Sequence, residues 1–168
     1  MKIIENYRKA LAAGISIKGL KSSKGHDGPI WSCSVYLSGV KLGGIREDGW
    51  GGGLIIEISP SSQSELVSAL KKVEYPLDEL SFKDLGEYGP TTDAGYIEWV
   101  LPKIVDELEA IKKMRRAVKT KTLYQLYSDP DAQHWTWGVL FCPEVKADLQ
   151  EQYGDNLKLI INETLSSL

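Results

Sequence analysis

The sequence has few of the residues on which a disulfide-stapled or membrane-spanning protein depends. Among 168 residues there are only two cysteines, Cys33 and Cys142, far apart in the chain. Two cysteines cannot build a disulfide scaffold or a cysteine-based zinc site. No run of about 20 apolar residues is present, so we expect no membrane span and no membrane partner. Residues 1–7 lack the apolar core of a secretory signal, which predicts a cytoplasmic protein.

The short motifs of common catalytic sites are also missing. There is no HExxH zinc motif, no DxDxDG calcium loop and no serine in a nucleophile elbow. The glycine-rich segment 49–53 has neither the GxGxxG spacing of a dinucleotide site nor the Lys-Ser/Thr of a P-loop. These absences favour a binding protein over an enzyme, and we expect neither a bound metal nor a cofactor.

Length and composition are those of an ordinary globular protein. The chain is 42% hydrophobic and 26% charged, with a formal net charge of -3. An acidic balance argues against non-specific coating of nucleic acid, which needs clustered cations. We expect one α+β domain over 1–168, with possible lobes 1–73 and 93–168 joined by an irregular connection over 74–92.

Hydrophobic periodicity in the first half predicts a helix and then a sheet. A period near 3.6 marks a helix over 2–13, and alternation then marks four strands between residues 15 and 58. The tetrapeptide 37–40 is typical of a tight hairpin, because Gly39 tolerates a positive φ. In an antiparallel meander the loop 22–29 and the glycine-rich loop lie at the same end of the sheet.

After the four strands we predict two helices, two strands, a helix and a strand. We predict a helix over 61–73 with a capping box of Ser62 and Glu65, and a long helix over 93–118 that Pro102 kinks or begins. Two strands (122–127 and 134–141), a helix from Pro143 to Gly154 and a strand over 157–161 follow. The expected fold is α+β, an N-terminal four-stranded antiparallel meander packed by helices and followed by a ββαβ unit.

The most informative segment is residues 46–53, where Trp50 lies among glycines and carboxylates. A tryptophan in this setting either covers the core from a loop or contacts a ligand or partner. The binding hypothesis joins the residues that the two loops bring together: Trp50, Glu47, Asp48, His26 and Asp27. The same His and carboxylates are compatible with a metal-dependent hydrolase, but plain turn chemistry is the simpler explanation of them.

A second candidate surface is the basic run near the end of the long helix. Its members are Lys112, Lys113, Arg115, Arg116, Lys119 and Lys121. Such a run is suited to phosphate, and so to nucleic acid or a nucleotide, or to an acidic partner surface. The alternative is that these cations only complement the dipole at the helix C-terminus.

Two loops and the tail carry a resemblance. Gly25-His26-Asp27-Gly28, then Asp48-Gly49-Trp50-Gly51-Gly52, and later Tyr153-Gly154-Asp155, resemble a group of small uncharacterised proteins of bacteria, phages and plasmids. The group has no assigned activity, so the resemblance implies no catalytic residue. It implies a phage or mobile-element accessory protein. The leading expectation is a non-enzymatic interaction protein that binds and inhibits or modulates a host protein complex, such as a defence complex.

Overall fold

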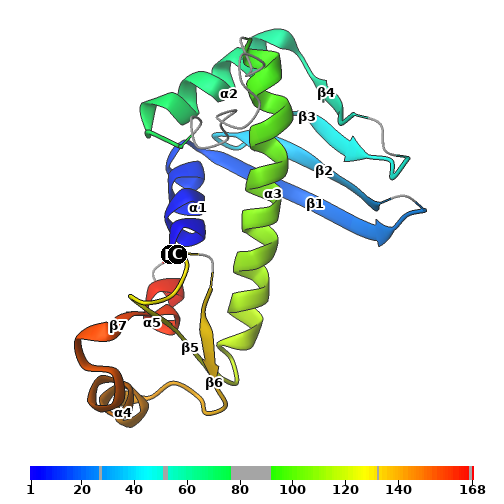
Figure 1. The fold of residues 1–168 in the computed structure, drawn as a ribbon. Coiled ribbons are helices and arrows are strands. Elements are labelled where there is room, and N and C mark those ends of the chain that lie inside the picture. Colours follow the sequence, from blue (N-terminus) through cyan, green and yellow to red (C-terminus); the bar gives the residue numbers. More distant parts are fainter. Residues whose placement is uncertain (27, 51–52, 77–91, 132, 167) are drawn as a thin grey trace. The chain divides into compact units, whose positions relative to one another are not determined.

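The computed structural model describes residues 1–26, 28–50, 53–76, 92–131, 133–166 and 168. The chain divides into two compact units. The four-stranded unit comprises residues 6–105, and the three-stranded unit comprises residues 1–5 and 106–168. Each unit has its own sheet (Figure 1) and is described by itself.

The four-stranded unit is the predicted antiparallel meander, with its strands in the order β1-β2-β3-β4. Its elements are α1 (Lys2–Ala12, which begins in the other unit), β1 (Ile15–Lys24), β2 (Pro29–Leu37), β3 (Val40–Glu47), β4 (Ile55–Ile58), α2 (Pro60–Lys72) and the first part of α3 (Asp93–Ala117). The turn between β2 and β3 has φ values of 48° at Ser38 and 84° at Gly39. Positive φ at both central residues matches the right-handed twist of the two strands.

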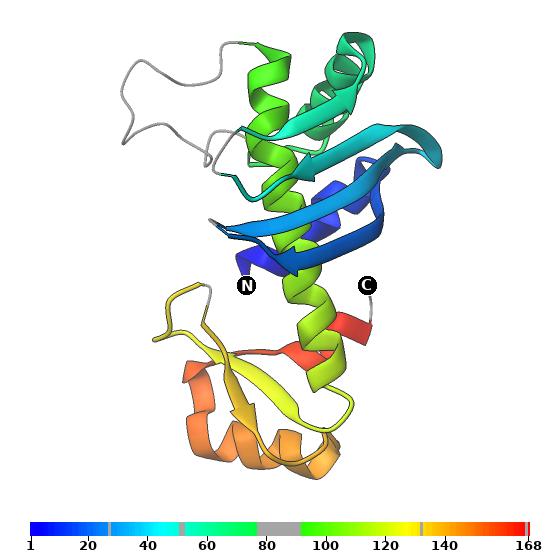
Figure 2. The ribbon, with the colours of Figure 1, turned by 90° about the vertical axis from the view of Figure 1, so that its right-hand side faces the viewer.

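One face of this sheet packs against helices and the other does not. Val35 and Ile45 on the inner face lie in a core with Leu66 and Leu70 of α2 and Leu101 of α3. Figure 2 shows the helices of this unit behind the sheet, and no described helix of the same unit covers its other face. Antiparallel sheets tolerate this arrangement when the free face is polar.

Helix α2 begins three residues earlier than the predicted capping box. Its N-cap is Ser59, whose side-chain oxygen accepts a hydrogen bond from the backbone N–H of Ser62 at 3.3 Å. Pro60 follows at the first helical position, where a missing N–H costs nothing. Ser62 is therefore inside the helix, and the capping box of Ser62 and Glu65 was wrong. Helix α3 also begins before Pro102, so the proline does not mark its first turn.

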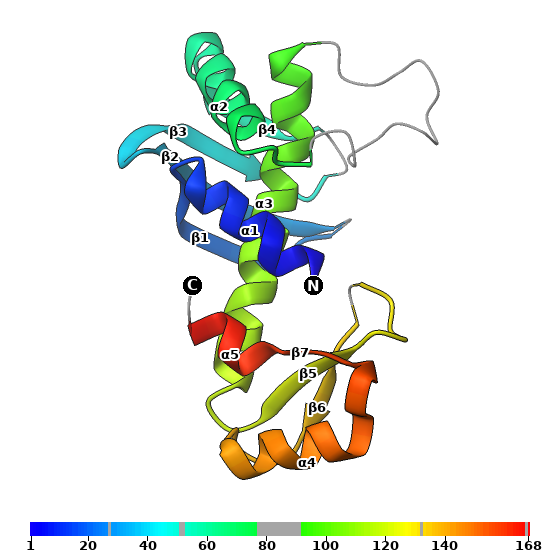
Figure 3. The same cartoon turned by 90° about the vertical axis from the view of Figure 1, so that its left-hand side faces the viewer.

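The three-stranded unit contains the predicted ββαβ order and one further helix. Its elements are β5 (Thr122–Leu126), β6 (Trp135–Trp137), α4 (Pro143–Tyr153), a 3-10 turn (Gly154–Asn156), β7 (Leu157–Ile160) and α5 (Ile161–Ser166). The strand order is β6-β5-β7, and both pairings are antiparallel. Figure 3 shows α4 and α5 on either side of this sheet. The sequence did not predict α5, and β6 is shorter than expected.

Strand β5 is the centre of this unit, and all five of its residues are buried. Tyr124 and Leu126 pack against Val145 and Leu149 of α4. On α5, the Asn162 side chain accepts a hydrogen bond from the N–H of Leu123 at 2.8 Å. The same amide donates to the carbonyl oxygen of Lys121 at 3.0 Å, which fastens α5 to the start of β5.

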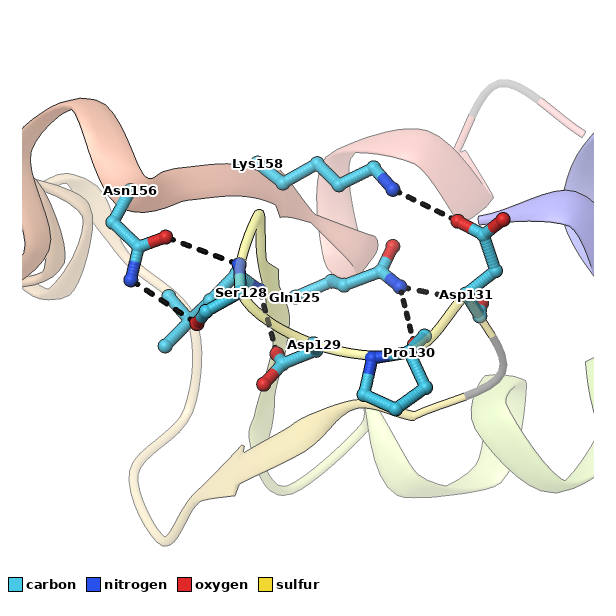
Figure 4. A network of polar contacts seen from close by, with 8 residues as sticks. Gln125, Ser128, Asp129, Pro130, Asp131, Asn156 and Lys158 are labelled. Carbon is cyan, nitrogen blue, oxygen red and sulfur yellow. Dashed lines mark hydrogen bonds and ion pairs between the residues drawn. The ribbon is translucent and has the colours of Figure 1, made fainter.

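Polar side chains hold the connection between β5 and β6 (Figure 4). Asp129 accepts hydrogen bonds from the N–H of Leu126 at 2.8 Å and from the indole of Trp135 at 3.1 Å. Lys158 forms an ion pair with Asp131 at 3.0 Å. The segment that we predicted as a turn is thus tied to both neighbouring strands by side chains.

No helix in the described part of the chain has the length and apolar character needed to cross a bilayer.

Candidate functional site

The loops after β1 and β3 meet at one end of the four-stranded sheet, as predicted from the meander. Gly49 is buried with a φ of 75°, and a Cβ built on it would lie 2.7 Å from Cγ1 of Ile30. The carbonyl oxygen of Gly28 and the Cα of Gly25 lie 3.4 and 3.5 Å from the same point. Only glycine permits this approach together with a positive φ. The β3–β4 loop therefore lies directly against the β1–β2 loop.

The two carboxylates of this loop hold its backbone. The side chain of Asp48 accepts a hydrogen bond from the N–H of Trp50 at 3.1 Å. Glu47 accepts a longer one from the N–H of Gly49 at 3.4 Å. Bonds from an acidic side chain to the N–H two residues later are typical of turns. In this arrangement Glu47 and Asp48 position the tryptophan.

Trp50 is 75% exposed, and Ile30 beside the same loop pair is 39% exposed. The alternative in which Trp50 covers the core was therefore wrong. A single exposed apolar residue is common, but here the turn also fixes the backbone N–H of the exposed tryptophan. We call Gly25, His26, Ile30, Asp48 and Trp50 the Trp50 surface.

The other proposed members of this site are only partly located. His26 is exposed, in the bend between β1 and β2. Asp27 lies outside the described residues, so its place in the site stays a prediction. Among the residues that the structure describes, no three His, Cys, Asp or Glu side chains are grouped so as to hold a metal ion.

The open face of the sheet carries a basic group that the sequence reasoning missed. Register places Lys21, Ser32 and Arg46 side by side across β1, β2 and β3, and Tyr36 opposite Lys41. The ammonium of Lys18 lies 4.5 Å from the ring centre of Tyr36. We call Lys18, Lys21, Lys41 and Arg46 the basic face.

Only one carboxylate, Glu57, shares the open face according to the strand register. Within the described residues none of the four cations forms an ion pair with a carboxylate. The signal in the sequence was only partial, because register shifts between Lys18 and Lys21 and between Val35 and Tyr36 interrupt the alternation of cations with apolar residues.

The six residues of the basic run are all exposed at the end of α3 and in the turn that follows. No ion pair to them occurs within the described part of the chain. Nearby, burial and the neighbouring Glu109 raise the pKa of the Asp106 carboxyl, while Lys113 acts in the opposite sense. Lys113 and Lys121 line one cavity of the three-stranded unit, and the other four cations do not.

No protein-family model matches the chain, and comparison with curated proteins and with solved structures likewise found no match.

Proposed function

We propose that this is a non-enzymatic interaction protein that binds an acidic surface of another protein through the Trp50 surface and the adjoining basic face. The observation that supports this most directly is the 75% exposure of Trp50, whose backbone N–H is held by Asp48. An exposed tryptophan on a restrained loop is the kind of residue that dominates binding energy in protein interfaces.

The restraint on the loop matters because ordering a flexible segment costs free energy on binding. The hydrogen bonds from Gly49 and Trp50 and the close packing of Gly49 on Ile30 reduce that cost in advance. Burial of an indole removes about 150–250 Å² from water. The loop pair is thus suited to insert one aromatic ring into a pocket on a partner.

The basic face determines the sign of charge that we expect on the proposed partner. Arg46 directly precedes the Glu47 and Asp48 turn, so the cations and the tryptophan belong to neighbouring parts of one sheet. Among the described residues the four cations outnumber the one carboxylate of this face, and net positive charge speeds association with an acidic surface and disfavours a basic one. The protein as a whole is acidic, so its positive charge is concentrated in a few regions, of which the basic face is one.

The resemblance of the GHDG and DGWGG loops to small phage and plasmid proteins directs the proposal toward a host protein complex. In this proposal the protein inhibits or modulates that complex by occupying an acidic surface. These two loops, 25–28 and 48–52, belong to the β1–β2 and β3–β4 connections, where the Trp50 surface lies.

The test begins with the partner that co-purifies from the host lysate, identified by native mass spectrometry and then produced separately. Calorimetry with Trp50→Ala is expected to show a loss of affinity of about 2–4 kcal/mol, as for other hot-spot tryptophans. The matched control is Val40→Ala, because Val40 is 65% exposed at the opposite end of β3. Equal affinities of the wild type and Trp50→Ala would exclude the proposal.

A second candidate is binding of nucleic acid or a nucleotide through Lys112, Lys113, Arg115, Arg116, Lys119 and Lys121. The observation in its favour is that all six are exposed and, within the described residues, form no ion pair. Affinity for an oligonucleotide would fall steeply with salt, and Arg115→Gln with Arg116→Gln would reduce the slope by about two. A flat salt response would remove this candidate.

A further inference from the structure

The three-stranded unit contains a cavity of about 310 Å³ that the proposed function does not use. Most of its lining is apolar and comes from three separate parts of the chain. The apolar residues are Met1, Ile3, Ala110, Met114, Ala117 and Leu123. Pockets that bind small molecules usually begin near this volume and have mainly apolar walls with a few polar groups.

The polar part of the lining is basic. Lys113, Lys121, His134 and Thr136 complete it, and no carboxylate belongs to the lining. Within the described residues neither Lys113 nor Lys121 forms an ion pair. The cavity therefore combines an apolar interior with positive charge that nothing in its own wall neutralises.

The wall is built from well-fixed positions. Leu123 and Thr136 are direct partners in the β5–β6 ladder, and Leu123 is only 2% exposed. Met114 on α3 is 4% exposed. The Asn162 amide holds the backbone at both Lys121 and Leu123, so one side chain sets the spacing of a charged and an apolar wall residue. A fixed wall lowers the ordering cost of binding.

We propose that this cavity binds a small monocarboxylate with an apolar tail, with the tail against Met114 and Leu123 and the carboxylate toward Lys113 and Lys121. A volume of 310 Å³ corresponds to about ten water molecules of liquid. A tail of about six to nine carbon atoms fits that space. The two ammonium groups are suited to a single carboxylate, whose charge the apolar interior alone would reject.

The first experiment measures binding of a series of straight-chain carboxylates to the full chain by calorimetry, with any tag at the carboxyl end because Met1 lines the cavity. Each added methylene is expected to tighten binding by about four-fold until the cavity is full. The tail-matched primary amines are expected to bind at least about ten-fold more weakly, because they place a cation beside two lysines.

The second experiment uses two charge-matched pairs of variants. Lys113→Gln and Lys121→Gln are expected to weaken octanoate binding by about ten-fold each. Lys112→Gln and Lys119→Gln remove the same charge from neighbouring exposed positions outside the lining, and are expected to leave binding within about two-fold. Ala117→Leu fills the cavity and is expected to abolish binding while circular dichroism stays unchanged.

Three results would each overturn the proposal. The first is no saturable binding of any carboxylate at millimolar concentration. The second is equal loss of affinity in Lys112→Gln and Lys113→Gln, which would indicate a general effect of surface charge. The third is unchanged binding in a folded Ala117→Leu protein, which would place the ligand elsewhere. None of these measurements involves the Trp50 surface, so they leave the proposed function to its own test.

Discussion

The two units use antiparallel sheets in opposite ways. In the four-stranded unit β1 is buried at Ile15 and becomes largely exposed along its length, whereas every residue of β5 in the other unit is buried. Because neighbouring residues of a strand point to opposite faces, a fully buried strand must be covered on both. The first unit thus keeps a free sheet face, whereas the described residues of the second cover both faces of its central strand and line a cavity.

The strand sequences reflect this difference. Strand β3 alternates the exposed Arg46 with the buried Ile45, but β5 reads Thr-Leu-Tyr-Gln-Leu without alternation. The Gln125 amide nitrogen donates to the carbonyl oxygens of Pro130 and Asp131, at 3.3 and 3.2 Å, whereas its Oε1 has no hydrogen-bond partner among the described residues. A buried polar group needs such partners, whereas the cations of the open face need only water.

The largest expected effect on stability is the difference between substitutions on the covered face and on the open face of β3. A Cβ on Gly43 would lie 1.9 Å from the carbonyl oxygen of Glu57, but one on Gly44 would meet nothing closer than 3.5 Å. We expect Gly43→Ala to cost about 3 kcal/mol or more, because β4 must move away. The control Gly44→Ala should change stability by less than about 1 kcal/mol. Urea denaturation of both variants is the measurement, and equal losses would contradict the assignment of faces.

The next largest effect on stability is expected from the hydrogen bonds that join α5 to β5 in the three-stranded unit. Asn162→Ala removes a partly buried hydrogen bond from the N–H of Leu123 and an exposed one to the carbonyl oxygen of Lys121. We expect a loss of about 2 kcal/mol in the free energy of unfolding, because both backbone groups lose their partner. Asn156→Ala removes bonds only to exposed atoms of Ser128 and should cost less than about 1 kcal/mol. Chemical denaturation is the measurement. A larger loss of unfolding free energy in Asn156→Ala than in Asn162→Ala would contradict this assignment.

A smaller effect is expected at high pH, in the same unit. Burial, then the 2.9 Å hydrogen bond to the Tyr153 hydroxyl, raise the pKa of Tyr124 above its ordinary value of 10.0. The folded state therefore keeps a proton that the unfolded state releases. This contribution to stability is complete below pH 10.0 and is lost as pH rises above it. Thermal unfolding should be measured from below pH 10.0 to above it. The Tm of the wild type should fall more steeply with pH than that of Tyr124→Phe, while Tyr127→Phe keeps the wild-type slope.

The smallest effect on stability is expected on the open face. Arg46→Gln and Lys21→Gln alter exposed side chains without ion pairs in the described residues, so unfolding free energies should stay within about 0.5 kcal/mol. Under the proposed function the same variants slow association with the acidic partner, most clearly at low salt. Stopped-flow association rates are the readout. Unchanged rates would indicate that the basic face lies outside the interface.

Local patterns were enough for much of the four-stranded unit. The helix over 2–13, the meander and the turn at Ser38 and Gly39 follow from periodicity and backbone sterics, which act between residues close in the chain. The meeting of the loops at residues 25–28 and 47–50 also follows, because alternate connections of a meander lie at the same end. The capping box at Ser62 was wrong because Ser59 and Pro60 offered a better start three residues earlier.

The sequence by itself thus determined the order of elements as far as β7, the α+β class and which two loops meet. Only the tertiary structure decided that Trp50 points outward, that both faces of β5 are covered and that α5 follows β7. Only it could bring residues 1–3, 110–123 and 134–136 to one cavity wall. The physical reason is the same throughout. Exposure and enclosure depend on which surfaces pack together across long sequence separations, and local propensity contains no term for that contact.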